Sequence, residues 1–128
     1  MTTLLNIIVL VLICTVVSGA EIIDMAGPTL SKDDKDGIAI LANDYFTAIQ
    51  KKDYALAASL VVTRQREYMK NSFKTFNADI PSNFSIGLFL EGGKVSISIV
   101  NTAIGGQCEK VDGKWHVFYA DIDEKLKP

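Results

Sequence analysis

Histidine and cysteine are scarce in this sequence: of its 128 residues, one is histidine and two are cysteine. A metal centre built from several histidines of one chain is therefore excluded. The sequence also lacks a glycine-rich phosphate loop, paired Cys-x-x-Cys motifs, an HExxH motif and a GxSxG nucleophile elbow. We therefore expect no metal and no cofactor, and we assign no residue a catalytic role.

Charged side chains are missing from the first twenty positions. Residues 4–17 form an almost continuous apolar run that ends in Ser18-Gly19-Ala20. Small residues at 18 and 20 suit cleavage before Glu21, so residues 1–20 are predicted to be a signal peptide and the protein to be secreted, to the extracellular space or a periplasm. The run is shorter than the ~20 residues of a membrane span, so we expect no stable span after cleavage; the alternative is an uncleaved anchor.

The sequence also has no excess of basic residues, because it contains 13 Lys and Arg residues and 15 Asp and Glu residues. Proteins that bind nucleic acid usually carry a basic footprint, so no nucleic-acid partner is expected. Cys108 is the one cysteine that would remain after cleavage, and it cannot form a disulfide within the chain. Three states stay open for it: a buried small hydrophobe, a free thiol, or an intermolecular disulfide.

Helical signals dominate the first half of the predicted mature chain. Residues 21–30 are predicted to be an extended leader. Ser31 is a candidate N-cap for a helix that continues to Lys52, and Asp53 is a candidate N-cap for a second, shorter helix. A third helix is predicted over residues 63–76.

A two-residue alternation of apolar and small polar residues begins at Phe84. Turns are predicted at Gly92-Gly93, Gly105-Gly106 and Asp112-Gly113, which divide the segment into four strands of an antiparallel meander. Residues 121–128 are predicted to be a charged, frayed tail. Three helices followed by four such strands indicate one α+β domain over residues 31–120.

Two stretches, ANDYFTAIQKKDYALAASLV and CEKVDGKWHVFY, resemble the NTF2-like superfamily, in particular a small exported branch with a helix–KKD–helix start and a DGKW final hairpin. The resemblance implies a cone in which three N-terminal helices pack on a curved four-stranded antiparallel sheet. The superfamily contains isomerases, dehydratases, binding proteins and non-catalytic subunits, so the fold does not decide the function.

Alternation in the strands predicts which side chains face the interior of such a cone. No carboxylate falls on that face, and the helices and last strand add aromatic and sulfur-bearing side chains. The candidate pocket residues are Tyr45, Met69, Phe73, Trp115 and Tyr119. We therefore expect a secreted, non-enzymatic NTF2-like protein that binds a small apolar ligand or a protein partner; the alternative is an isomerase-type or dehydratase-type enzyme that uses pocket tyrosines.

The opposite sheet face is predicted to carry large apolar residues among small ones. Such a patch can form an interface, and the resemblance also implies dimers formed through this face. The candidate interface residues of a homodimer are Phe89, Val100, Phe118 and Cys108. Asn83-Phe84-Ser85 is a glycosylation sequon, which makes Asn83 a candidate acceptor.

Overall fold

A computed structural model describes residues 20–77 and 79–128 as an α+β structure with a five-stranded mixed sheet. The predicted signal peptide, except for Ala20, lies outside the described residues. The strands lie in the order β1-β2-β3-β4-β5, which is also their order along the chain. They are β1 (Glu21–Met25), β2 (Ser85–Glu91), β3 (Lys94–Ile99), β4 (Gly105–Val111) and β5 (Lys114–Phe118).

Three helices precede β2, as the sequence predicted. They are α2 (Lys32–Gln50), α3 (Tyr54–Ser59) and α4 (Arg66–Phe73), the last entered through the 3-10 turn η1 (Thr63–Gln65). Both predicted N-caps are confirmed, because the Ser31 hydroxyl accepts from the Asp34 amide at 3.1 Å and the Asp53 carboxylate accepts from the Leu56 amide at 3.2 Å. These bonds satisfy amide groups that have no partner inside the first turn of a helix.

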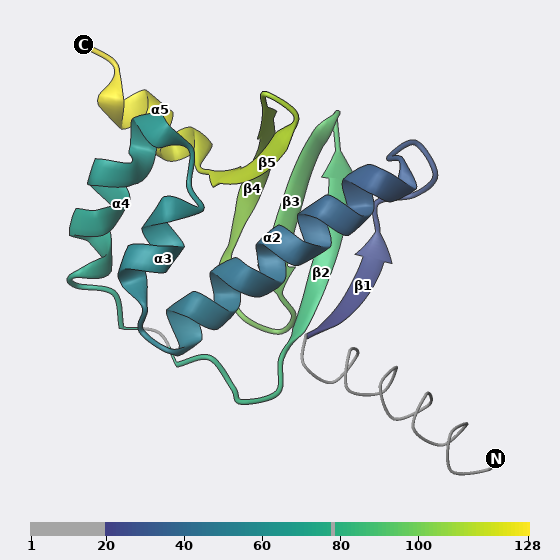
Figure 1. Cartoon of the computed structure of the whole chain (residues 1–128), viewed down its shortest axis with the longest axis horizontal. Coiled ribbons are helices and arrows are strands. Elements are labelled where there is room, and N and C mark those ends of the chain that lie inside the picture. The colour runs from purple at the N-terminus through teal and green to yellow at the C-terminus, as the bar shows by residue number, and fades with distance from the viewer. Residues whose placement is uncertain (1–19, 78) are drawn as a thin grey trace, which may run out of the picture.

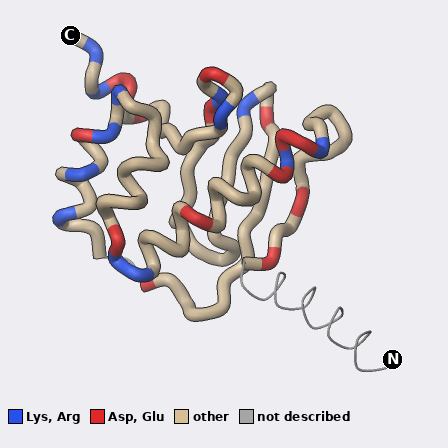
Figure 2. Tube along the Cα trace, viewed as in Figure 1, with Lys and Arg blue, Asp and Glu red and all other residues tan. Residues whose placement is uncertain are grey.

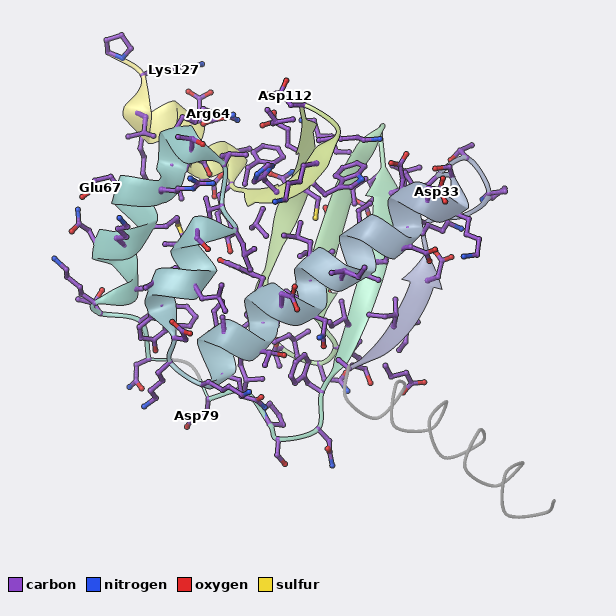
Figure 3. The ribbon with its side chains drawn as sticks, viewed as in Figure 1. Asp33, Arg64, Glu67, Asp79, Asp112 and Lys127 are labelled. Carbon is purple, nitrogen blue, oxygen red and sulfur yellow. The ribbon has the colours of Figure 1, made fainter. Side chains whose placement is uncertain are left out.

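The long helix α2 crosses one face of the sheet, with α3 and α4 beside its C-terminal end (Figure 1). Its buried stripe includes Ile38, Tyr45 and Phe46, which meet the inward residues of β2 and β3. The strand alternation is as predicted on the central strands, where Leu88 and Ile97 are each 1% exposed. Figure 3 shows side chains filling the space between α2 and the sheet, while labelled charged residues such as Asp33 and Asp112 point outward.

The wholly antiparallel, four-stranded sheet that we predicted is wrong at one edge. The predicted leader contains β1, which pairs in parallel with β2 and places Ile22 opposite Ile86. The β-branched pair Ile22-Ile23 favours a strand, but pairing across more than sixty residues is a tertiary choice that local pattern cannot reveal. The sheet is therefore mixed.

Two other local predictions also differ from the structure. The second predicted turn is not at Gly105-Gly106, which begin β4; Asn101 instead adopts the left-handed conformation in the loop between β3 and β4, with φ of 65°. The predicted tail is not frayed from residue 121, because α5 (Ala120–Leu126) forms there. Asp121 lies in its first turn, where a carboxylate stabilises the helix dipole, and Ile122 is buried.

The last hairpin follows the predicted Asp112-Gly113 turn, in which both residues have positive φ. Beyond it, the free edge of β5 is covered by the segment that follows α3. The Val62 amide donates to the Val117 carbonyl at 2.9 Å, and the Val117 amide donates to the Leu60 carbonyl at 2.9 Å. This pairing connects the α3–α4 unit to the sheet.

Candidate functional site

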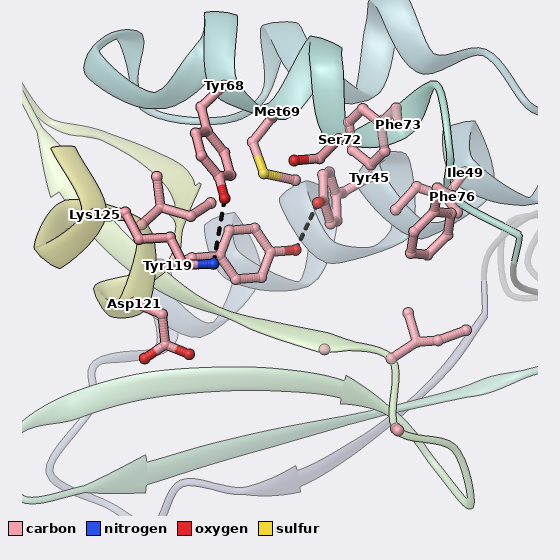
Figure 4. A pocket seen from close by; sticks show the side chains of 14 residues that line it. Tyr45, Ile49, Tyr68, Met69, Ser72, Phe73, Phe76, Tyr119, Asp121 and Lys125 are labelled. Atoms are coloured by element: carbon pink, nitrogen blue, oxygen red, sulfur yellow. Dashed lines mark hydrogen bonds between the residues drawn. The ribbon is translucent and has the colours of Figure 1, made fainter.

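A cavity of about 520 Å³ lies where the C-terminal part of α2, helix α4, helix α5 and the start of β4 come together. Figure 4 shows its side chains pointing toward one another from these elements. Most are aromatic or aliphatic: Tyr45, Ile49, Tyr68, Met69, Phe73, Phe76, Ile104, Tyr119 and Ile122. This volume and this lining are typical of small-molecule sites, which are mostly apolar with a few placed polar groups.

The central polar feature of the cavity is a pair of tyrosine hydroxyls. The hydroxyl oxygens of Tyr45 and Tyr119 lie 2.6 Å apart and form a hydrogen bond, although the residues are 74 positions apart in sequence (Figure 4). Tyr45 is 1% exposed. Burial raises the pKa of Tyr45 well above its usual range, and it raises the pKa of Tyr119 to about 12. Both hydroxyls are therefore neutral hydrogen-bonding groups at pH 7.

Tyr119 is held in place by the buried side chain of Gln65. The Gln65 amide nitrogen donates to the Tyr119 carbonyl at 2.9 Å and to Asp123 at 2.7 Å, while its oxygen accepts from the Tyr119 amide at 2.9 Å. Gln65 is 0% exposed. Because every polar atom of this amide has a partner, Gln65 joins the start of α4 to the end of β5 and the start of α5.

An ion pair on the outside strengthens the same junction. Arg64 donates to both oxygens of Asp123, at 3.0 and 2.9 Å, and to Glu109 at 2.9 Å. The Arg64 guanidinium and then the Gln65 amide lower the pKa of Asp123 to about 2. Helix α5, which forms one wall of the cavity, is thus fixed by charge-assisted bonds.

Polar groups at the cavity rim come from α4 and α5. The Lys125 ammonium lies 3.3 Å from the Tyr68 hydroxyl, to which it donates, and 5.8 Å from the centre of the same ring. Asp121 and Ser72 also line the cavity, and Asp121 is exposed. The rim is therefore more polar than the interior.

Stacked aromatic rings support the wall on the α4 side. The rings of Tyr54 and Phe73 stack with their centres 5.2 Å apart, and Phe76 meets both rings edge-on. Contacts of this geometry add about 0.5–1.5 kcal/mol per pair beyond the burial of apolar area. They hold Phe73 and Phe76 in position against the cavity.

Four of the five pocket residues predicted from the sequence, Tyr45, Met69, Phe73 and Tyr119, line this cavity. Trp115, the fifth, does not line this cavity. Trp115 is half-buried near the start of α2, where its indole nitrogen donates to Asp34 at 3.1 Å. Its ring packs on Gly37, at which a Cβ atom would come within 3.1 Å of the indole. Alternation predicted its face correctly, but not its position along the sheet.

The four interface candidates do not all share one face. Phe89 and Phe118 lie on the outer face in one cross-strand row, with Ser96 and Gln107 between them. Val100 is also on this face. Its amide donates to the carbonyl of Ser85, and Ser85 points outward because its neighbour Ile86 points inward.

All three apolar candidates are half-buried. They do not form one continuous patch, since strands in a sheet are about 4.8 Å apart and two strands separate those of Phe89 and Phe118. A residue that we did not predict, the 62% exposed Met25, lies directly beside Phe89.

Cys108 faces the opposite way and is a correction to the predicted interface. It lies in register with Val95 and Val117 on the inward face and is 6% exposed. Burial raises the pKa of its thiol to about 12, so the thiol is neutral at pH 7. A shift of one position along a strand moves a side chain to the other face. The sequence of this strand does not show clearly which of its residues point inward, so Cys108 was predicted on the wrong face.

Asn83 is exposed in the loop before β2, where a glycosylating enzyme can reach it. Positive and negative residues are interspersed over the described chain (Figure 2).

Within residues 20–77 and 79–128, no group of three or more His, Cys, Asp or Glu side chains is placed to hold a metal ion. In the same part of the chain, no helix combines the length and apolar character needed to cross a membrane.

Several site residues were not predicted from the sequence, notably Gln65, Lys125 and Asp121. Gln65 is a polar residue at a position where helical spacing favours an apolar one, and this is a weak signal. Lys125 and Asp121 were assigned to the predicted tail.

Comparison with protein-family models, with curated proteins and with solved structures finds no match for this chain.

Proposed function

We propose that this protein is a secreted, non-enzymatic member of the NTF2-like superfamily that binds a small apolar ligand in the cavity between α2, α4, α5 and β4. The observation that carries the proposal is the cavity itself, with a volume of about 520 Å³ and a lining made mainly of aromatic and aliphatic side chains. Apolar walls offer water few hydrogen bonds, so the replacement of this water by an apolar ligand is favourable.

The NTF2-like assignment is supported by the element order and by the placement of the cavity. Three helices lead into a sheet whose inward face packs on α2, and the cavity is lined by residues of the helices and of the start of β4. The parallel strand β1 and the C-terminal helix α5 are additions to the pattern that the resemblance implies. Secretion is supported by the apolar run and small residues of positions 1–20.

Binding is favoured over catalysis by the chemistry of the lining. General acid–base catalysis needs a group whose pKa lies near the working pH. Burial moves the pKa of both inner tyrosines upward, away from neutrality, and the one carboxylate in the lining, Asp121, is exposed at the rim. The tyrosines are therefore better suited to contact a ligand than to move a proton.

The experiment is a titration of residues 21–128 with the neutral apolar dye N-phenyl-1-naphthylamine, whose fluorescence rises in apolar surroundings. Ser72 lines the cavity, so Ser72→Phe should fill it and reduce the affinity for the dye at least tenfold. Asn71→Phe adds the same ring at an exposed neighbouring position of α4 and should leave the affinity unchanged. Absence of dye binding by the wild type, or equal effects of the two variants, would refute the proposed function.

A further inference from the structure

The tyrosine pair has more hydrogen-bond donors than the described residues use. The hydroxyls of Tyr45 and Tyr119 carry two hydrogens, and the bond between them uses one. Neither hydroxyl has another hydrogen-bond partner among residues 20–77 and 79–128. One O–H is therefore left to donate from the wall of the cavity that both residues line.

A buried donor without a partner costs about 1–3 kcal/mol, so a ligand that fills this cavity needs an acceptor at this place. Building on the proposed function, we infer that the ligand is an apolar compound bearing an oxygen acceptor that receives this hydrogen bond. The tyrosine pair then selects among apolar compounds, which the aromatic and aliphatic side chains of the lining cannot do by contact alone.

The surroundings of the pair point to a neutral acceptor, such as a ketone or ester carbonyl, rather than a carboxylate. The same burial that opposes ionisation of the two phenols opposes an anion placed against them. The nearest cation of the lining, Lys125, is at the rim and bonds Tyr68. A carbonyl oxygen needs no counter-charge and accepts an O–H bond along its lone pairs.

The position of Tyr119 makes this donor rigid. Its backbone is held on both sides by the Gln65 amide, and its ring lies against Gly106, where a Cβ atom would come within 3.2 Å of the hydroxyl oxygen. The hydroxyl is therefore placed before a ligand arrives, and little side-chain freedom is lost on binding.

The test uses two probes of nearly equal shape, 2-acetonaphthone and 2-isopropenylnaphthalene, which differ by a carbonyl oxygen in place of a methylene group. The wild type should bind the ketone about three- to tenfold more tightly, the worth of one neutral hydrogen bond. The double variant Tyr45→Phe/Tyr119→Phe should lose this preference while still binding the hydrocarbon. Tyr54→Phe removes a tyrosine hydroxyl that does not line the cavity and keeps the ring, so it should retain the preference, which makes it the matched control.

A second readout needs no variant. The infrared carbonyl band of 2-acetonaphthone bound to the wild type should lie at lower frequency than in hexane, because a hydrogen bond weakens the C=O bond. Equal affinities for the two probes together with an unshifted band would overturn the inference and leave the proposed function standing. If neither probe nor N-phenyl-1-naphthylamine binds, the inference and the proposed function both fail.

Discussion

Replacing Gln65 by leucine should destabilise the fold by about 1–3 kcal/mol, although the two side chains are similar in size. Gln65 is 0% exposed, and leucine would leave the Tyr119 amide without its partner, whereas the Tyr119 carbonyl would keep its bonds from the Ile122 and Asp123 amides. An orphaned buried group costs about 1–3 kcal/mol, and the Tyr119 amide is the one group that loses its partner, so this range is the expected loss. Asp123 keeps its bonds to Arg64, so it adds little.

The free energy of unfolding would be measured by urea titration at pH 7 with linear extrapolation. The matched control is Gln50→Leu, because the Gln50 amide donates to the Pro81 carbonyl at 2.7 Å in an exposed setting. That control should lose less than about 1 kcal/mol, since water replaces an exposed partner. If Gln65→Leu also loses less than this, or no more than the control, the argument that Gln65 fixes α5 and Tyr119 is wrong.

Four further outcomes are expected. Trp115→Ala should cost about 2 kcal/mol in urea titrations, below the 3–5 of a fully buried aromatic, because Trp115 is half-buried; a loss near zero would contradict its packing on α2. The pKa of Asp123 is lowered from 3.8 to about 2 on folding, so its stabilising effect is present above pH 3.8 and lost as the pH falls to about 2, and Asp123→Asn should flatten the measured stability across that window. The buried Cys108 thiol should react with Ellman's reagent at pH 8 only after unfolding, and fast native labelling would show that it is accessible. If the outer sheet face forms a homodimer, sedimentation at about 50 µM should detect a dimer that Phe89→Asp/Phe118→Asp converts to monomer, whereas a monomeric wild type rules that dimer out.

The local signals of this sequence were sufficient for most of the elements. Caps at Ser31 and Asp53, the helical stripe of α2, and positive-φ turns at Gly92-Gly93 and Asp112-Gly113 act within a few residues, so they can be recognised without the fold. The alternation of β3, and the looser alternation of β2, also identified the core face, because a strand with one buried face has a period of two.

Helical spacing and strand alternation also identified the cavity candidates, but neither pattern shows that these residues meet in one cavity. Tyr45 was placed inward by helical spacing and Tyr119 by strand alternation, and each pattern reports only the face of its own element. The hydrogen bond between them depends on how α2 crosses the sheet, which no local pattern contains. For the same reason alternation placed Trp115 on the correct face of β5 but could not show that it packs near the start of α2 and not in this cavity.

Tertiary structure alone decided the parts that long-range pairing controls. The pattern of Glu21–Met25 is compatible with a leader or a strand, and its parallel pairing with β2 selects the strand. Residues 120–126 are too few to form a stable helix by themselves, and the buried Ile122 and the bonds from Gln65 and Arg64 supply what their sequence lacks. The sequence by itself determined the elements whose stability is local, whereas β1, α5 and the cavity wall that α5 forms depend on contacts made only after the chain has folded.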